Sequence, residues 1–399
     1  MVSTAPGRAM PIFAAVLATL MVGSVGAQEA RSSVTTEVKG EFAAYTDTDS
    51  VSVVSPSTGV KLHDASSGWQ ASGSYLIDVV SAASVDIVST ASGRWNEVRH
   101  AASLQAGYKP YDLGGTVSGS VSREPDYLSL TGGGGVSWDF VRKTVMPSAT
   151  YSFTHDIAGR AGTPFEVYSL ELDRHSLGAR LELVINRESL LDVGVDAGFE
   201  VGHQEKPYRY VPLFAPDIVS AIGAGMPVDA VNAARLPGRT EERLPTTRQR
   251  YAFSARFAQR LADSTFLIDQ RLYADSWGVK ASTTNLRVVF DLSRRVNIWP
   301  ELRFHAQSGA SFWRLAYAGS LASDGTLTVP ALRTGDRELS PLISGSGGAG
   351  LHLNLGSAAD PTELGFTLLA QSIATRYTDA LFITQRFGFF SAVQAEAKF

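Results

Sequence analysis

The residues best suited to chemistry are charged side chains between residues 250 and 305, which share one face of stretches that alternate between apolar and polar residues. In the stretch 296–306, for example, Glu301 and Arg303 alternate with Leu302 and Phe304. Such groups could select passing solutes in a pore. Alternatively, they could form a lattice of salt bridges that stiffens a barrel whose lumen is plugged by loops, and the sequence leaves both open. The candidate lining set comprises Arg250, Arg256, Arg260, Asp269, Arg271, Asp275, Arg287, Asp291, Glu301, Arg303 and His305.

Enzymatic chemistry has weaker support. The seven histidines include His155, His175, His203 and His305, but the chain has no Gly-x-Ser-x-Gly or His-Glu-x-x-His motif. The glycine-rich stretches at 132–135 and 345–348 are not followed by the Lys-Ser/Thr of a phosphate loop. We therefore expect no enzyme, and a hydrolase is the least favoured alternative.

Four acidic residues, Asp47, Asp49, Asp78 and Asp86, could offer oxygens to calcium. Their spacing lacks the glycine and terminal glutamate of an EF-hand loop, so solvated acidic groups are the simpler interpretation. The chain has no cysteine, which excludes disulfides, thiolate metal sites and thiol nucleophiles. We predict neither a metal nor another cofactor.

The elements that must position these side chains show a period of two. Residues 191–201 carry apolar side chains at the odd positions, such as Leu191, Val193 and Phe199, and polar or tiny ones between them. A helix would repeat its apolar face every three or four residues, so this pattern predicts strands. Most such stretches reach the roughly 9 to 11 residues that a tilted strand needs to cross a bilayer.

This pattern predicts about sixteen strands, within a range of 14 to 18, in one antiparallel up-and-down transmembrane β-barrel. The predicted strands are 34–46, 51–61, 68–78, 96–108, 113–122, 127–140, 145–155, 171–186, 190–203, 247–261, 265–276, 281–292, 296–309, 342–356, 364–375 and 382–399.

The connections between these strands alternate in length. Every second one is short, as at 109–112 and 293–295, whereas the long ones, 204–246 and 310–341 above all, fall between the others. A membrane barrel has tight periplasmic turns and long extracellular loops, so this parity supports it over a soluble sandwich. We expect 204–246 and 310–341 to be extracellular loops.

The apolar segment that leads into one connection is a candidate plug. The loop expected from residue 78 to 92 is too apolar for a freely solvated surface, so it could fold into the barrel as a plug or constriction. The residues concerned are Asp78, Ser81, Ser84 and Asp86. The alternative is an extended strand end with a cap.

Both ends of the chain fit export to an outer membrane. Arg8 precedes an apolar run that ends in small residues up to Ala27, which predicts a signal peptide over 1–27 and a mature barrel over 28–399. The last residue is Phe399, and Phe387, Phe389 and Val393 share its parity. Such a terminal strand is typical of barrels inserted by the outer-membrane assembly machinery, an expected partner.

Composition narrows the alternatives. The formal net charge of −4 argues against nucleic-acid binding. Hydrophobic residues make up 44% of the chain, yet the mean hydropathy is only +0.01, so apolar residues do not gather into helical membrane spans.

Three further stretches carry distinctive residues: 68–86, from Gly68-Trp69 to Asp86; 207–211, Pro-Tyr-Arg-Tyr-Val; and 273–278, Tyr-Ala-Asp-Ser-Trp-Gly. They resemble an uncharacterised family of Gram-negative outer-membrane proteins that carry a domain of unknown function. The resemblance implies an outer-membrane barrel and supplies no activity, ligand or catalytic residue. At 304–313 the family's tyrosine-rich pattern is altered, so shared lumen chemistry does not follow from it.

Together these observations predict an outer-membrane β-barrel, embedded in the lipid bilayer, that passes small solutes as a porin-like channel with a charged lumen. The alternative is a plugged structural or surface-binding barrel without transport.

Overall fold

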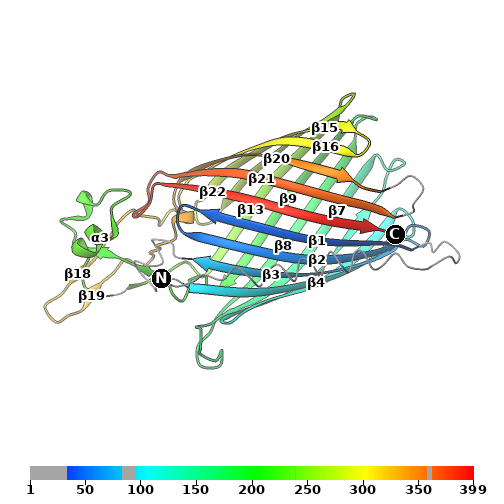
Figure 1. Ribbon diagram of the computed structural model, residues 1–399. Helices are drawn as coiled ribbons and strands as arrows, with labels where there is room; N and C mark the ends of the chain where they lie inside the picture. Colours follow the sequence, from blue (N-terminus) through cyan, green and yellow to red (C-terminus); the bar gives the residue numbers. More distant parts are fainter. Residues whose placement is uncertain (1–33, 83–94, 239, 357–361) are drawn as a thin grey trace, which may run out of the picture.

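The computed structural model describes residues 34–82, 95–238, 240–356 and 362–399, and within them sixteen strands form one closed antiparallel barrel (Figure 1). All sixteen predicted strands are confirmed, with ends shifted by a few residues. In order around the barrel they are β1 (Val34–Asp47), β2 (Val51–Asp64), β3 (Trp69–Ala82), β4 (Trp95–Tyr108), β5 (Leu113–Glu124), β6 (Tyr127–Trp138), β7 (Val145–Ala158), β8 (Leu170–Val184), β9 (Ser189–Gly202), β13 (Thr247–Arg260), β14 (Ser264–Asp275), β15 (Lys280–Ser293), β16 (Val296–Gln307), β20 (Leu342–Asn354), β21 (Glu363–Tyr377) and β22 (Gln385–Lys398).

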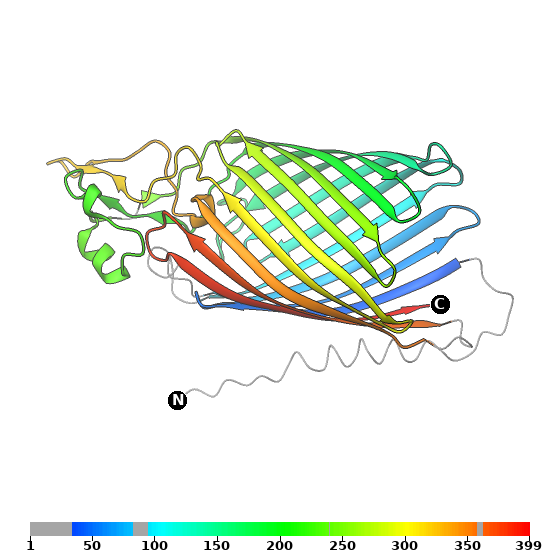
Figure 2. The ribbon, with the colours of Figure 1, turned by 90° about the horizontal axis from the view of Figure 1, so that it is seen from above.

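The barrel closes where the last strand meets the first. β22 pairs antiparallel with β1, for example at Phe42 opposite Val393 and at Val38 opposite Ala397. The sheet therefore has no free edge. A free edge would be unstable in hydrocarbon, because its unpaired backbone groups would find no water to hydrogen-bond. The strands are 12 to 15 residues long and run obliquely to the barrel axis, as Figure 2 shows.

One face of the strands is apolar and exposed. Leu104, Val117, Leu302 and Phe304 are exposed by 72%, 65%, 61% and 54%. A soluble protein rarely leaves so continuous an apolar surface in water, whereas a membrane barrel must present one to lipid. Exposed aromatic residues at the end with the short turns, among them Tyr108 and Trp138, fit the girdle that marks a membrane interface.

The opposite face of the strands is polar and points into the barrel. Arg99 and Tyr127 lie on this inner face, and both line a cavity beneath the loops that gather at one end. The register carries the same face around the wall, from Thr131 opposite Thr154 to Thr154 opposite Arg174. We call these two sides of the wall the outer face and the inner face.

The two ends of the barrel differ. One end has mostly short hairpin connections, such as 109–112, 261–263 and 294–295, and also holds the C-terminus (Figure 1). The other end carries the segments 203–246, 308–341 and 378–384, which we call the mouth loops. The predicted parity of the connections thus appears in the fold, and we refer to the turn end and the loop end.

The mouth loops have short elements and small apolar cores of their own. The first holds β10 (Tyr210–Val211), β11 (Leu213–Phe214), η1 (Val219–Ala221), α3 (Val228–Ala234) and β12 (Thr240–Glu241). The second holds β17 (Tyr317–Ala318), β18 (Ser320–Leu321), β19 (Leu327–Thr328) and η2 (Arg337–Leu339). Phe214 and Val231 are fully buried, with Leu381 and Phe382 of the third mouth loop packed beside them. In Figures 1 and 2 α3 and the β18–β19 hairpin project beyond the wall.

One expectation is wrong at the end of β3. Asp78 and Ser81 were expected in a plug loop, but β3 continues to Ala82, so both belong to the barrel wall. Pairing with β4 along the whole strand, and with β2 from Val79 to Ala82, explains the extension, because the added residues gain ladder hydrogen bonds. Ser84 and Asp86, like the predicted signal peptide, lie outside the described residues.

In the part of the chain that the structure describes, no helix is both long and apolar enough to span a membrane.

Candidate functional site at the mouth of the barrel

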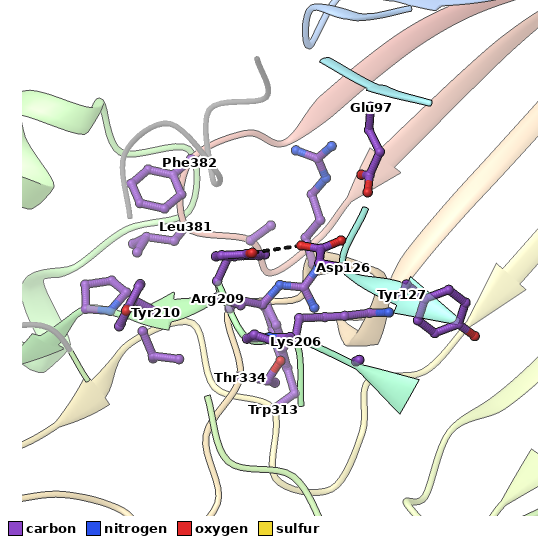
Figure 3. Close-up of a pocket in the computed structure, with 18 of the residues that line it drawn as sticks. Glu97, Asp126, Tyr127, Lys206, Arg209, Tyr210, Trp313, Thr334, Leu381 and Phe382 are labelled. Atoms are coloured by element: carbon purple, nitrogen blue, oxygen red, sulfur yellow. Dashed lines mark hydrogen bonds between the residues drawn. The ribbon is translucent and has the colours of Figure 1, made fainter. Parts of the chain in front are cut away.

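A cavity lies at the loop end, between the inner face of β4 to β7 and the mouth loops. Its volume is about 760 Å³, the size of a small-molecule site. The strands contribute Glu97, Arg99 and Tyr127, and the loops contribute aromatic and apolar side chains such as Trp313 and Phe382 (Figure 3). We call this space the mouth cavity.

The cavity keeps its shape through polar contacts between two mouth loops. Arg209 Nη1 contacts Asp336 at 2.6 Å and Glu242 at 3.6 Å, and the Thr334 hydroxyl donates to the Glu242 carboxylate. Glu242 is almost fully buried, and this burial raises the pKa of its carboxyl group, although Arg209 and Thr334 oppose the shift. The contacts of Arg209 with Asp336 and of Thr334 with Glu242 each join residues more than ninety positions apart in the sequence.

A second set of contacts fixes the 308–341 loop to the wall. Arg337 in η2 pairs with Asp49 in the β1–β2 turn at 2.5 Å, and its guanidinium lies 5.4 Å from the Tyr377 ring centroid. The neighbouring Glu338 accepts from the Tyr377 hydroxyl at 2.7 Å and pairs with Arg386 at 3.2 Å. A buried, hydrogen-bonded ion pair of this kind holds a loop in one register.

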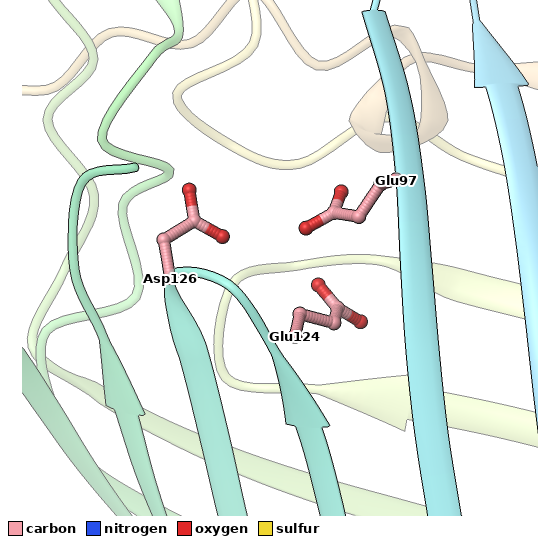
Figure 4. Close-up of side chains that lie close together, drawn as sticks. All are labelled: Glu97, Glu124 and Asp126. Carbon is pink, nitrogen blue, oxygen red and sulfur yellow. The ribbon is translucent and has the colours of Figure 1, made fainter. Parts of the chain in front are cut away.

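Three carboxylates meet at one side of the cavity. Oxygens of Glu97, Glu124 and Asp126 lie within 4.8 Å of one another (Figure 4). The Tyr208 hydroxyl donates to Asp126 at 2.7 Å, and partial burial raises the pKa of Tyr208. Carboxylate oxygens suit Ca²⁺ or Mg²⁺, but calcium takes six to eight ligands, so this trio alone does not define a metal centre.

Sequence reasoning missed the whole mouth cavity. Its loop residues, such as Arg209 and Trp313, follow no periodic pattern, and they come together only through tertiary packing. The one usable signal was the apolar and aromatic stretch 208–214, which is unusual for a solvated loop.

The acidic residues considered for calcium have other partners where the structure describes them. Asp47 accepts from the backbone N–H groups of Asp49 and Val51, both at 3.0 Å, and so caps the β1–β2 turn. Asp78 accepts from Ser55 at 2.5 Å and pairs with Arg99. The structure therefore does not bring Asp47 and Asp78 together in one ligand set.

The eleven candidate lining residues all share the inner face. Cross-strand pairing places Arg256 opposite Asp269, Arg250 opposite Asp275, and Arg287 opposite Glu301. Arg303 and His305 follow at the same parity on β16. Their role in a solute path stays a prediction, but their common face follows from the register.

Most of these residues are paired rather than free. Arg287 contacts Glu301 at 2.6 Å and Arg260 contacts Asp291 at 2.5 Å, while Arg256 pairs with Asp269. Further pairs are Arg250–Glu200 at 3.1 Å and Arg271–Asp196 at 3.9 Å, and His305 shares a 2.8 Å hydrogen bond with Thr283. The inner face thus carries many charges with local compensation.

Asp275 differs from the rest of the set. Its side chain is fully buried, pairs with Arg248, and accepts from the backbone N–H groups of Trp277 and Val279 at 3.0 and 2.9 Å. It therefore caps the β14–β15 turn. Sequence reasoning did not include its partner Arg248 or the acids Asp192, Asp196 and Glu200 of β9, although their parity could have found them.

A closed sheet with an apolar outer face, a charged inner face and long loops at one end defines a transmembrane β-barrel of the bacterial outer membrane. Residues 171–357 match the family model described as Protein of unknown function (DUF3570). This match, somewhat less than half of the chain, confirms the resemblance to barrel proteins that carry a domain of unknown function. No curated protein matches the sequence.

Several solved structures that match this chain come from Pseudomonas aeruginosa. The outer membrane protein opdK is 8% identical, with 92% of this chain and 99% of that chain covered and a TM-score of 0.42. OccK5 (OpdH) is 10% identical, with 92% and 98% covered and a TM-score of 0.42. A mutant of the ferric enterobactin receptor (PfeA) is 10% identical, with 85% of this chain covered and a TM-score of 0.41, and this chain spans only 53% of that receptor.

Proposed function

We propose that the protein is a channel for small polar solutes across the outer membrane, with the mouth loops outside the cell. The observation that carries this proposal is the inner face of the closed sixteen-strand wall, which presents charged and hydroxyl groups along the barrel. A barrel of this strand number has room for an aqueous path, and a packed apolar core would not place ion pairs there. The mouth cavity would be the entrance, where solutes first meet protein groups.

A second candidate function is a surface-binding barrel without transport. The observation that favours it is the packing of the mouth loops, whose apolar clusters and buried ion pairs make a built cover rather than loose loops. In that case the mouth cavity would bind its ligand from outside, and nothing would pass further.

Single-channel recording of the purified, folded protein in planar bilayers separates the two. The channel gives steady open currents, whereas a correctly folded barrel that stays silent would retire transport and leave the surface-binding alternative.

Substitutions on the inner face add a test of where the ions pass. Asp192 lies 3.3 Å from Arg180 and opposite Arg256 in the register. Asp192→Asn removes a negative charge beside Arg180 and Arg256, so the reversal potential in a salt gradient should move toward anion selectivity. Arg256→Gln should move it the opposite way, and identical reversal potentials in both variants would contradict passage along this wall.

A further inference from the structure

A groove on the outer face, near the loop end, is lined in part by polar side chains and a lysine that suit a lipid headgroup. It spans β15, β16 and β20, has a volume of about 520 Å³, and is lined among others by Lys280, Ser282, Ala306, Ile343 and Thr378. Below it the outer face of the same strands is apolar, with exposed Leu286, Leu302 and Phe304. The groove therefore lies at the boundary between the apolar part of the outer face and the polar groups of the loop end.

Two cations flank this groove. Lys280 begins β15, and Arg376 lies near the end of β21 on the row that runs from Ser282 through Ala306 and Ile343. Three strand spacings of about 4.8 Å, roughly 14 Å in all, separate Ser282 from Arg376, and Lys280 lies two residues from Ser282 toward the loop end. The long side chains of Lys280 and Arg376 can both extend over the groove and contact a single lipid headgroup.

The charges of Lys280 and Arg376 are uncompensated within the described chain. Both residues are exposed, and neither side chain forms an ion pair within 4.0 Å in that part of the protein. Most arginines of the inner face, by contrast, have a carboxylate partner. An unpaired cation facing hydrocarbon is costly at mid-membrane but costs little at the interface, where it can pair with an anionic headgroup.

A neighbouring polar cluster extends the same surface. The Gln270 amide donates to Ser282 Oγ at 2.9 Å and accepts from the Thr284 hydroxyl at 2.6 Å. These three residues share the outer face with Leu272 and Leu286, where a membrane barrel ordinarily has apolar side chains. These hydroxyl and amide groups extend the polar part of the outer face down from the groove.

From this arrangement we propose that the groove binds the phosphate group of an anionic lipid in the outer leaflet, with Lys280 and Arg376 as its cationic contacts. The lipid's acyl chains would lie against the apolar side chains of the outer face, among them Ala306, Leu302 and Ile343. The leaflet follows from the orientation proposed above, whereas binding of lipid phosphate by these residues is independent of transport. A silent barrel in a bilayer recording would leave this proposal untouched.

Binding of lipid A to the purified, detergent-solubilised protein, measured by native mass spectrometry, tests the proposal. The double variant Lys280→Gln/Arg376→Gln should bind about tenfold more weakly, since two charge-assisted contacts are lost. The matched control, Lys61→Gln/Arg303→Gln, removes one lysine and one arginine from the inner face and should bind like the parent protein. Heat-modifiable gel mobility verifies that every variant is folded.

Three results would overturn the assignment. They are equal affinity of the groove variant and the parent, equal weakening in the groove and control variants, and full competition by inorganic phosphate at millimolar concentration. The last would mean a site for free phosphate rather than for a lipid.

Discussion

Glu242 shows how a single residue can set the behaviour of the mouth. It is a buried carboxylic acid that receives hydrogen bonds from Thr334 and from the backbone N–H of Lys206, at 3.2 Å for the latter, with Arg209 nearby. Because its pKa is raised by burial, the folded loops favour the protonated form more than the opened loops do. Its contribution to loop stability is complete below the ordinary glutamate pKa and is lost as the pH rises through the raised one.

We therefore expect the contacts around Glu242 to open more readily at pH 8 than at pH 5, and Glu242→Gln to abolish most of this difference. Hydrogen exchange of residues 206–212, corrected for the intrinsic pH dependence of amide exchange, measures the opening. Glu241→Gln is the matched control, because the neighbouring Glu241 side chain is 64% exposed and should keep the pH dependence. An unchanged pH dependence in the Glu242 variant would contradict this account.

At the scale of the element, the strands were predictable from sequence and the loops were not. A strand of a membrane barrel must place apolar and polar groups on opposite faces, so stretches such as 191–201 carry the information locally. The mouth cavity instead depends on contacts such as Arg209 with Asp336, between segments that have no periodicity. The end of β3 was misjudged because the apolar residues after Asp78 were taken as a buried loop, whereas they continue the strand in register with β4.

A single capping residue in a turn can contribute strongly to the stability of the folded barrel, and Asp275 in the β14–β15 turn is an example. Asp275→Ala removes the cap of the β14–β15 turn and leaves Arg248, whose side chain is 11% exposed, without its carboxylate. Losing one partner of a buried pair costs about 3 to 5 kcal/mol, whereas an exposed pair contributes about 1 kcal/mol or less.

We expect Asp275→Ala to lower the free energy of unfolding in urea by about 3 kcal/mol. Asp269→Ala, at a side chain that is 28% exposed, should cost about 1 kcal/mol or less. Equal losses in the two variants would show that Asp275 acts as an ordinary wall charge and not as a turn cap.

The whole molecule is a wall with two unlike faces. The outer face presents apolar side chains to the lipid, while the inner face carries paired charges and hydroxyl groups that are unfavourable in hydrocarbon. The loops close over one end around a cavity, and the other end keeps mostly short turns. Both the proposed channel and the proposed lipid site depend on this sidedness, the first on the inner face and the second on the outer.

Cysteine labelling along β13 tests this sidedness directly, because the chain has no cysteine of its own. Ser254→Cys and Ala258→Cys lie on the inner face, whereas Ala255→Cys and Phe257→Cys lie on the outer face. In protein reconstituted into lipid vesicles, a water-soluble maleimide should label the first two and spare the second two. Equal labelling at all four positions, or protection of the inner pair alone, would contradict a membrane-spanning barrel with a water-accessible interior.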